Sequence, residues 1–188
     1  MIKIAVLGDI GSGKSYVAKK FGYPVFDADA EVSKLYKQSR KCYHKLKKKL
    51  PAYITSFPVK KSKLVSAIIA NKDNLKKIIR IVHPLIRKRM NIFLKKNKNK
   101  KIVILDIPLL LENKINKKND ILVFVQSKKL DIVKRLKKRS NFNNELLSKF
   151  RNIQLPLDYK KKKSHFIIKN NFTNKSIKLG IKNILKEI

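Results

Sequence analysis

The feature that most constrains this fold is an octapeptide that follows a short apolar run at the start of the chain. The run Ile2–Leu7 is rich in β-branched residues and predicts a buried strand. Residues Gly8–Ser15 then fit the pattern G-x-x-x-x-G-K-[ST], and Tyr16–Phe21 predicts a helix. Strand, glycine-bearing turn and helix are the context that this pattern requires. Because the chain holds only five glycines, a chance match is disfavoured, and we predict a phosphate-binding loop (P-loop).

Each residue type in this loop has a physical reason. Glycine lets backbone N–H groups approach phosphate oxygens, and the start of a helix adds partial positive charge. Lys14 can reach the β- and γ-phosphates, and the Ser15 hydroxyl can bind Mg²⁺. The loop therefore predicts nucleotide binding, but it does not separate kinases from GTPases, ATPases or nucleic-acid motors.

Strand and helix patterns alternate along the whole chain. This alternation predicts an α/β fold of the P-loop NTPase type, a three-layer sandwich whose mostly parallel sheet is flanked by helices. Besides the first strand, strands are expected at Pro24–Phe26, Ile102–Leu105, Ile121–Val125 and Phe166–Ile168. Further helices are expected at Ala30–Leu50, Ser62–Ala70, Asn74–Lys96, Leu130–Lys138, Glu145–Ile153 and from about Thr173, with a break or new start at His83-Pro84.

We expect one domain over residues 1–188 with three parts. The helical run between the second and third strands is too long for a simple crossover, which predicts an acceptor-binding lobe over about 30–100. The nucleotide core would then comprise about 1–29 and 101–188. A lid is expected at about 135–155, around a polar stretch.

Acidic residues follow two of the predicted strands. The carboxyl ends of parallel strands line the ligand crevice, so Asp29 is predicted to orient or deprotonate an acceptor hydroxyl and Asp106 to lie near Mg²⁺. A structural capping role is the alternative for both, and Asp27 is either a helix cap or a group beside the site. Glu112 is either a surface charge or an acceptor contact, and the sequence leaves both open.

Three of the scarce arginines gather near the polar stretch Ser140–Asn144. These are Arg135, Arg139 and Arg151. Guanidinium groups stabilise charge spread over phosphoryl oxygens, which suits a lid that closes over the transferring group. For Arg151, a solvated helix face is the favoured alternative.

The net charge of +36 raises the question of nucleic-acid binding. The lysines are scattered along the whole chain, however, and no base-reading or RNA-binding module is recognisable. We therefore favour compositional drift, with only non-specific contacts to nucleic acid, and the positive field would still attract anionic nucleotides.

Cysteine content and hydropathy bear on the location of the protein. The single cysteine, Cys42, cannot form an internal disulfide and suits a reducing cytosol. No stretch approaches the roughly 18 apolar residues that a membrane span needs. We expect a cytoplasmic monomer with no membrane partner.

The order of several motifs resembles the dephospho-CoA kinase family. The motifs are GDIGSGKS, VFDAD, VHPLIR, LDIPLLLEN, KRLKKR, NIQLPLDYK and HFIIKNN, and together they cover essentially the whole chain. The resemblance implies that ATP phosphorylates the ribose 3′-hydroxyl of 3′-dephospho-CoA to give CoA and ADP, the last step of coenzyme A biosynthesis.

The resemblance also implies roles for particular residues. Asp29 would be the catalytic base, Lys14 and Arg139 catalytic cations, and Ser15 and Asp106 the residues that hold Mg²⁺. The nucleotide-binding residues would be Gly11, Ser12, Gly13, Lys14, Ser15, Tyr16 and, near the adenine, Asn170; those on the acceptor side would be Asp29, His83 with Pro84, Asp106 and Arg135.

The chain departs from the family pattern at five places. Tyr16 replaces the small residue that usually follows the P-loop serine, and Phe172 replaces the glycine expected two positions after Asn170. Lys60-Lys61 replaces an acidic–arginine pair, and the segments before VFDAD and before Val59 are shorter than usual. These departures concern the adenine contact and the helical lobe more than the reaction.

Two other functions remain as alternatives. A nucleoside or nucleotide kinase would share the P-loop, but the HPLI motif and the long helical segment argue against it. A nucleic-acid-binding protein with a vestigial nucleotide site would explain the charge, but the complete P-loop and the DAD motif argue against it.

Overall fold

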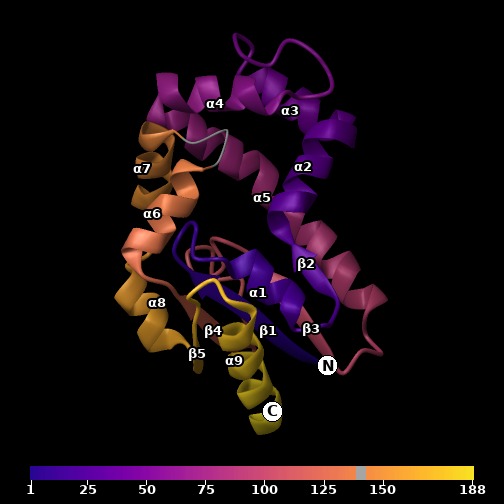
Figure 1. The fold of residues 1–188 in the computed structure, drawn as a ribbon. Coiled ribbons are helices and arrows are strands. Elements are labelled where there is room, and N and C mark those ends of the chain that lie inside the picture. The colour runs from indigo at the N-terminus through magenta and orange to yellow at the C-terminus, as the bar shows by residue number, and fades with distance from the viewer. Residues whose placement is uncertain (139–142) are drawn as a thin grey trace. The chain divides into compact units, whose positions relative to one another are not determined.

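The computed structural model describes residues 1–138 and 143–188, which form two compact units (Figure 1). The first unit comprises Met1–Asp27, Asn97–Phe142 and Arg151–Ile188, and the second comprises Ala28–Lys96 and Asn143–Phe150. The segment predicted as a lid is thus divided between the two units. The assignment of a nucleotide core, an acceptor lobe and a lid stays a prediction.

The first unit is built on a five-stranded parallel sheet in the order β2-β3-β1-β4-β5. The strands are β1 (Ile2–Gly8), β2 (Val25–Asp27), β3 (Ile102–Asp106), β4 (Ile121–Gln126) and β5 (Phe166–Lys169). The helices of this unit are α1 (Lys14–Lys20), α6 (Lys129–Lys137), α8 (Leu157–Lys163) and α9 (Asn174–Glu187). The predicted fold class and all five predicted strands are confirmed.

Chain connectivity explains why helices cover both faces of this sheet. From β1 the chain moves outward to β2, and from β4 it moves outward in the opposite direction to β5. Since crossovers between parallel strands are right-handed, these two connections place α1 and α8 on opposite faces. Helix α8 was not predicted, because its sequence LDYKKKK hides the apolar periodicity that marks a helix.

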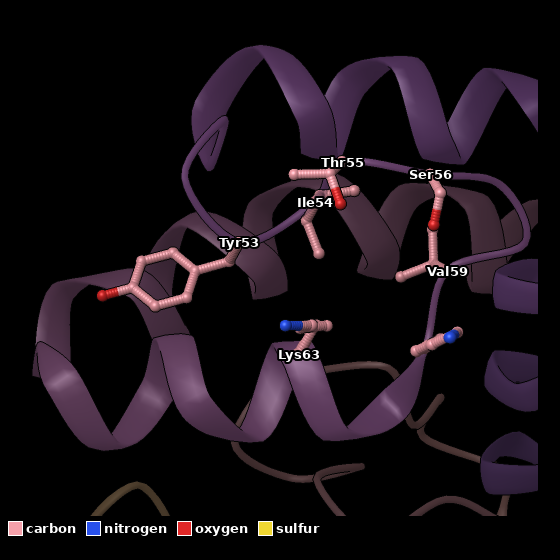
Figure 2. Close-up of a pocket in the computed structure, with 7 residues that line it drawn as sticks. Tyr53, Ile54, Thr55, Ser56, Val59 and Lys63 are labelled. Atoms are coloured by element: carbon pink, nitrogen blue, oxygen red, sulfur yellow. The ribbon is translucent and has the colours of Figure 1, made fainter.

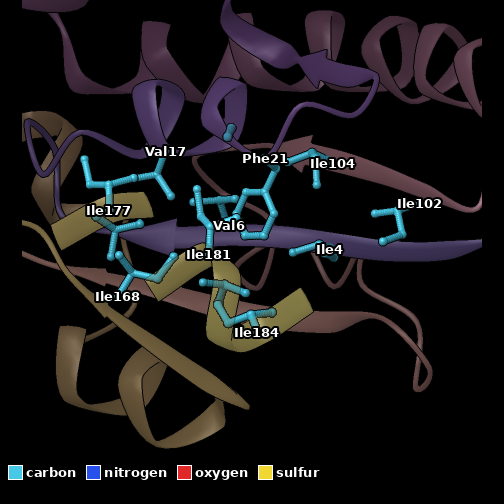
Figure 3. Packing of buried hydrophobic residues seen from close by; sticks show 13 residues of the cluster. Ile4, Val6, Val17, Phe21, Ile102, Ile104, Ile168, Ile177, Ile181 and Ile184 are labelled. Carbon is cyan, nitrogen blue, oxygen red and sulfur yellow. The ribbon is translucent and has the colours of Figure 1, made fainter. Parts of the chain in front are cut away.

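One face of the sheet packs against α1 and α9 (Figure 3). Ile4 and Val6 of β1 meet Val17 and Phe21 of α1 and three isoleucines of α9, spaced as one face of a helix. The alternate strand residues, such as Ala5 and Leu7, are buried too. A strand buried on both faces reads as a continuous apolar run, which is why β1 could be predicted.

The second unit is helical. It contains α2 (Ala28–Gln38), α3 (Arg40–Lys49), α4 (Lys61–Ala70), α5 (Lys72–Lys96) and most of α7 (Asn144–Asn152). The single helix predicted over Ala30–Leu50 is wrong, since Ser39 separates α2 from α3. The Ser39 hydroxyl accepts the backbone N–H of Cys42 at 3.1 Å and so caps α3.

The break predicted at His83-Pro84 is also wrong, because α5 continues through Pro84. Proline removes one backbone donor from a helix, whereas α5 buries an apolar face that includes Ile78, Val82 and Ile86. Packing of this face outweighs the local loss. None of the described helices is long and apolar enough to cross a membrane.

Cys42 lies in α3 and is fully buried. Burial raises the pKa of the Cys42 thiol, although Arg89 and Lys45 oppose the shift. Since the thiolate is the reactive form, this cysteine acts as a small apolar core residue.

We predict that α9 anchors the core of the first unit through one face. Ile177→Ala should lower the free energy of unfolding by about 2–5 kcal/mol, because Ile177 is 0% exposed and its removal leaves a cavity. Leu179→Ala, on the same helix at 60% exposure, should change it by less than about 0.5 kcal/mol. Urea denaturation followed by circular dichroism measures both, and equal losses would contradict this packing.

Candidate functional site

The P-loop joins β1 to α1 at the carboxyl end of the central strand. Gly13 has a positive φ of 90°, and a Cβ at this position would lie 2.5 Å from Nδ2 of Asn170. Only glycine fits both the conformation and the space. The loop is closed by the N–H of Ser12, which donates to the carbonyl of Asp9 at 3.2 Å.

The Ser12 carbonyl holds the P-loop against the ends of two neighbouring strands. It accepts a hydrogen bond of 2.8 Å from Asn170 Nδ2, after β5, and one of 3.0 Å from Ser127 Oγ, after β4. Asn170 is buried, and its Oδ1 accepts the N–H of Phe172 at 2.8 Å. Asn170 therefore shapes the P-loop; its predicted place beside the adenine stays a prediction.

The Lys14 ammonium is hydrogen-bonded to the backbone of the P-loop itself. It donates to the carbonyl of Asp9 at 2.8 Å and to that of Gly8 at 3.3 Å. Ser15 is exposed in the first turn of α1. The Tyr16 hydroxyl bonds to Oδ1 of Asn174, so this residue links α1 to the start of α9.

Two carboxylates end neighbouring strands. Asp27 of β2 is the register partner of Asp106 of β3, so the two side chains lie on the same face of the sheet. Together with the Ser15 hydroxyl they offer oxygen donors, which Mg²⁺ prefers. Within residues 1–138 and 143–188 no group of three His, Cys, Asp or Glu forms a metal cluster, and Mg²⁺ held partly by substrate phosphates needs none.

Arg135 and Phe172 form a stacked pair beside the P-loop. The guanidinium of Arg135 lies 4.3 Å from the centroid of the Phe172 ring. Phe172 has a positive φ of 64°, and its ring edge would be 3.4 Å from a Cβ at Gly13. Arg135, which was predicted to bind substrate, thus contacts Phe172, which departs from the family pattern. Arg139 lies outside the described residues.

Glu112 has a structural partner that the sequence did not reveal. Its Oε1 lies 2.6 Å from Nζ of Lys160, which is 1% exposed, and accepts the N–H of Leu155 at 3.0 Å. These two contacts tie the loop after β3 to α8 and to the chain just before it. Of the two possibilities left open for Glu112, the surface charge is excluded, since its side chain is 10% exposed.

Asp9 and Arg151 form a second ion pair in this unit. Arg151 Nη2 lies 3.6 Å from Asp9 Oδ2, and Arg151 is 44% exposed. The favoured prediction of a solvated position for Arg151 missed this contact, and Asp9 was not singled out. Asp9 stands at a variable position of the P-loop pattern, and nothing in the neighbouring sequence indicates a partner as distant as Arg151.

The second unit holds Asp29 and His83. Asp29 is exposed in the first turn of α2, and Asp27 ends β2 directly before that helix. The same turn is fixed to α5 because Glu31 Oε2 accepts Arg89 Nη1 at 2.8 Å. Burial opposes ionisation of Glu31, but hydrogen bonds from Lys34 and Arg89 outweigh it and lower the pKa.

A small pocket of about 100 Å³ also lies in the second unit (Figure 2). It is lined by Tyr53, Ile54, Thr55, Ser56, Val59, Lys60 and Lys63. Its lining includes Lys60, one of the two lysines that depart from the family pattern, but none of the predicted site residues.

The parallel sheet with a P-loop after its central strand defines the P-loop NTPase fold. A shikimate kinase from Bacteroides thetaiotaomicron shares this fold, with a TM-score of 0.52 at 13% identity over 100% of this chain and 99% of its own. The family model described as dephospho-CoA kinase matches residues 2–176. The chain belongs to the dephospho-CoA kinase family.

Relatives of known name agree with this assignment. The dephospho-CoA kinase of Wolbachia pipientis wMel is 32% identical, covering 98% of this chain and 97% of its own length. That of Bacillus anthracis is 30% identical, with 99% and 96% covered. A solved structure of the dephospho-CoA kinase from Campylobacter jejuni has a TM-score of 0.62 at 23% identity, covering 98% of this chain and 96% of its own. The predicted family is confirmed.

We predict that the Glu112–Lys160 pair stabilises the first unit. Lys160→Met should lower the free energy of unfolding by about 3–5 kcal/mol, because it leaves the Glu112 carboxylate buried without its cation. The double variant Glu112→Gln/Lys160→Met should recover part of this loss. Urea denaturation is the measurement, with Lys162→Met, an exposed lysine of α8, as control. A Lys160→Met variant as stable as the control would contradict the prediction.

Proposed function

We propose that this protein transfers the γ-phosphate of ATP to the ribose 3′-hydroxyl of 3′-dephospho-CoA, giving CoA and ADP. The observation that carries this proposal is the family match over residues 2–176, which includes the complete P-loop. A nucleoside kinase and a nucleic-acid-binding protein are not favoured, since the match extends over both the P-loop and the helical region.

The reaction is a direct displacement at phosphorus. The 3′-oxygen forms a bond to the γ-phosphorus while the bond to the bridging oxygen breaks, and ADP leaves. The proton of the 3′-hydroxyl goes to a base, for which we propose the exposed Asp29 carboxylate. Such a step needs positioning and charge stabilisation rather than a covalent enzyme intermediate.

The donor side is supplied by the first unit. The backbone N–H groups of Gly11–Ser15 would bind the ATP phosphates, and Lys14 would exchange the carbonyls of Asp9 and Gly8 for phosphate oxygens. Mg²⁺, held by Ser15 and Asp106, would neutralise charge on the phosphates. Arg139 is proposed as a further cation on the lid.

The residues proposed for the acceptor side are those that the family resemblance implies. We propose that His83, with Pro84, shapes the site for dephospho-CoA, and that Asp106 and Arg135 contact substrate. The Tyr16 backbone and Asn170 would complete the nucleotide site. The chain is proposed to act as a cytoplasmic monomer, and a light-scattering mass well above 21.9 kDa would contradict the monomer. Contacts with nucleic acid are expected to be non-specific.

We predict ADP formation from Mg-ATP when 3′-dephospho-CoA is the acceptor. Asp29→Asn should lower kcat by about 10²–10⁴-fold, the usual contribution of a general base. Asp73→Asn, which removes an exposed carboxylate at the start of α5, is the matched control and should retain activity.

A panel of nucleosides and nucleotides decides between the kinase classes. Turnover with these acceptors alone would move the protein to a nucleoside or nucleotide kinase. A fully active Asp29→Asn variant would remove Asp29 from the role of base.

We predict that Asn170 acts on ATP binding through the P-loop. Asn170→Ala removes a donor to the Ser12 carbonyl, so the KM for ATP should rise about tenfold, with a smaller effect on the KM for the acceptor. Asn183→Ala, at an exposed position of α9, is the control. Equal changes in both KM values would show that the substitution acts on the fold as a whole.

A further inference from the structure

The P-loop carries a carboxylate of its own. The side chain of Asp9 is 14% exposed, and its Oδ1 accepts the backbone N–H of Ile10 at 2.7 Å. The P-loop, whose backbone N–H groups are suited to bind phosphate, therefore already carries one negative group, the Asp9 carboxylate. Beside a bound polyphosphate this charge is repulsive unless a cation neutralises it.

Arg151 supplies that cation. Its Nη2 lies 3.6 Å from Asp9 Oδ2, and the side chain is 44% exposed. An ion pair of this length and exposure adds little to folding stability. A guanidinium has five N–H donors, so Arg151 keeps donors for a second anion while it faces Asp9.

The backbone that carries Arg151 is anchored in the first unit. The Arg151 carbonyl accepts the N–H of Gln154 at 3.0 Å, and the next N–H, from Leu155, bonds to Glu112. Glu112 in turn pairs with the buried Lys160. The backbone at Arg151 is thus held in place, while the exposed guanidinium can reorient between neighbouring anions.

We propose that Arg151 is a further phosphate-contacting residue of the donor site and that Asp9 positions it beside the P-loop before ATP binds. The inference rests on the proposed function in that the donor is ATP. A phosphate carries more charge than a carboxylate and suits the guanidinium fork at least as well. On binding, Arg151 keeps its contact with Asp9 and donates its remaining N–H groups to phosphate oxygens.

Calorimetric binding of a non-hydrolysable ATP analogue with Mg²⁺, without any acceptor, tests Arg151. Arg151→Ala should weaken binding about tenfold, the scale of one charge-assisted hydrogen bond. Lys182→Ala removes one charge from an exposed position of α9 and should change the affinity less than about twofold. Arg151→Lys should fall between, and thermal melting checks that each variant is folded. An Arg151→Ala affinity within twofold of the unsubstituted protein would overturn the proposal.

A double-mutant cycle tests the positioning role of Asp9. With Ala at position 151 the Asp9 carboxylate lacks its cation, so adding Asp9→Asn should restore affinity about threefold. With Arg151 present, Asp9→Asn should not tighten binding, because the repulsion it relieves is already neutralised. Equal tightening in both backgrounds would show that Asp9 does not act through Arg151. Since no acceptor is present, this outcome is independent of the dephospho-CoA assay.

Discussion

The Ser12 carbonyl is the point on which the shape of the P-loop depends. It accepts hydrogen bonds from Ser127 and from Asn170, which follow β4 and β5. The sheet order places these two strands beside β1 on one side, so their carboxyl ends meet the loop that β1 leads into. Asn170 also binds the N–H of Phe172, which brings the Arg135 stack to the same place. The sheet thus holds the P-loop through the Ser12 carbonyl.

Electrostatics in this unit works by local pairing rather than by net charge. The chain carries 48 Lys and Arg, yet two carboxylates with little exposure are each paired with one particular cation. Glu112 pairs with a fully buried lysine, and Asp120 pairs with Lys3 of β1 at 2.6 Å. Most of the remaining lysines are exposed, where solvent screens them. The net charge of +36 is consequently a poor guide to function, whereas individual ion pairs account for these two carboxylates.

Local signals explain which parts of the molecule could be predicted from the sequence. The P-loop and β1 were predictable because a fixed motif follows a strand buried on both faces. The helix end at Ser39 and the continuity of α5 through Pro84 depend on one cap and on tertiary packing, which a pattern does not resolve. The pairs Asp9–Arg151 and Glu112–Lys160 join segments far apart in the sequence, so the periodicity of apolar residues does not predict them. Most of the helices in the second unit were predictable, but Asn143–Phe150 was not predicted to belong to it. The proposed role of Asp29 rests on its place after a predicted strand and on the family resemblance.

Phe172, which departs from the family pattern expected from the sequence, adopts a backbone conformation that glycine takes readily. The family expects glycine here, and Phe172 still has the left-handed φ of 64° that glycine adopts readily. A phenylalanine in this conformation costs about 1–2 kcal/mol. Two contacts offset that cost: Asn170 Oδ1 accepts the Phe172 N–H, and the Arg135 guanidinium covers the ring. Since Asn170 also binds the Ser12 carbonyl, the turn that a glycine would make is preserved next to the P-loop, with an aromatic surface added to it.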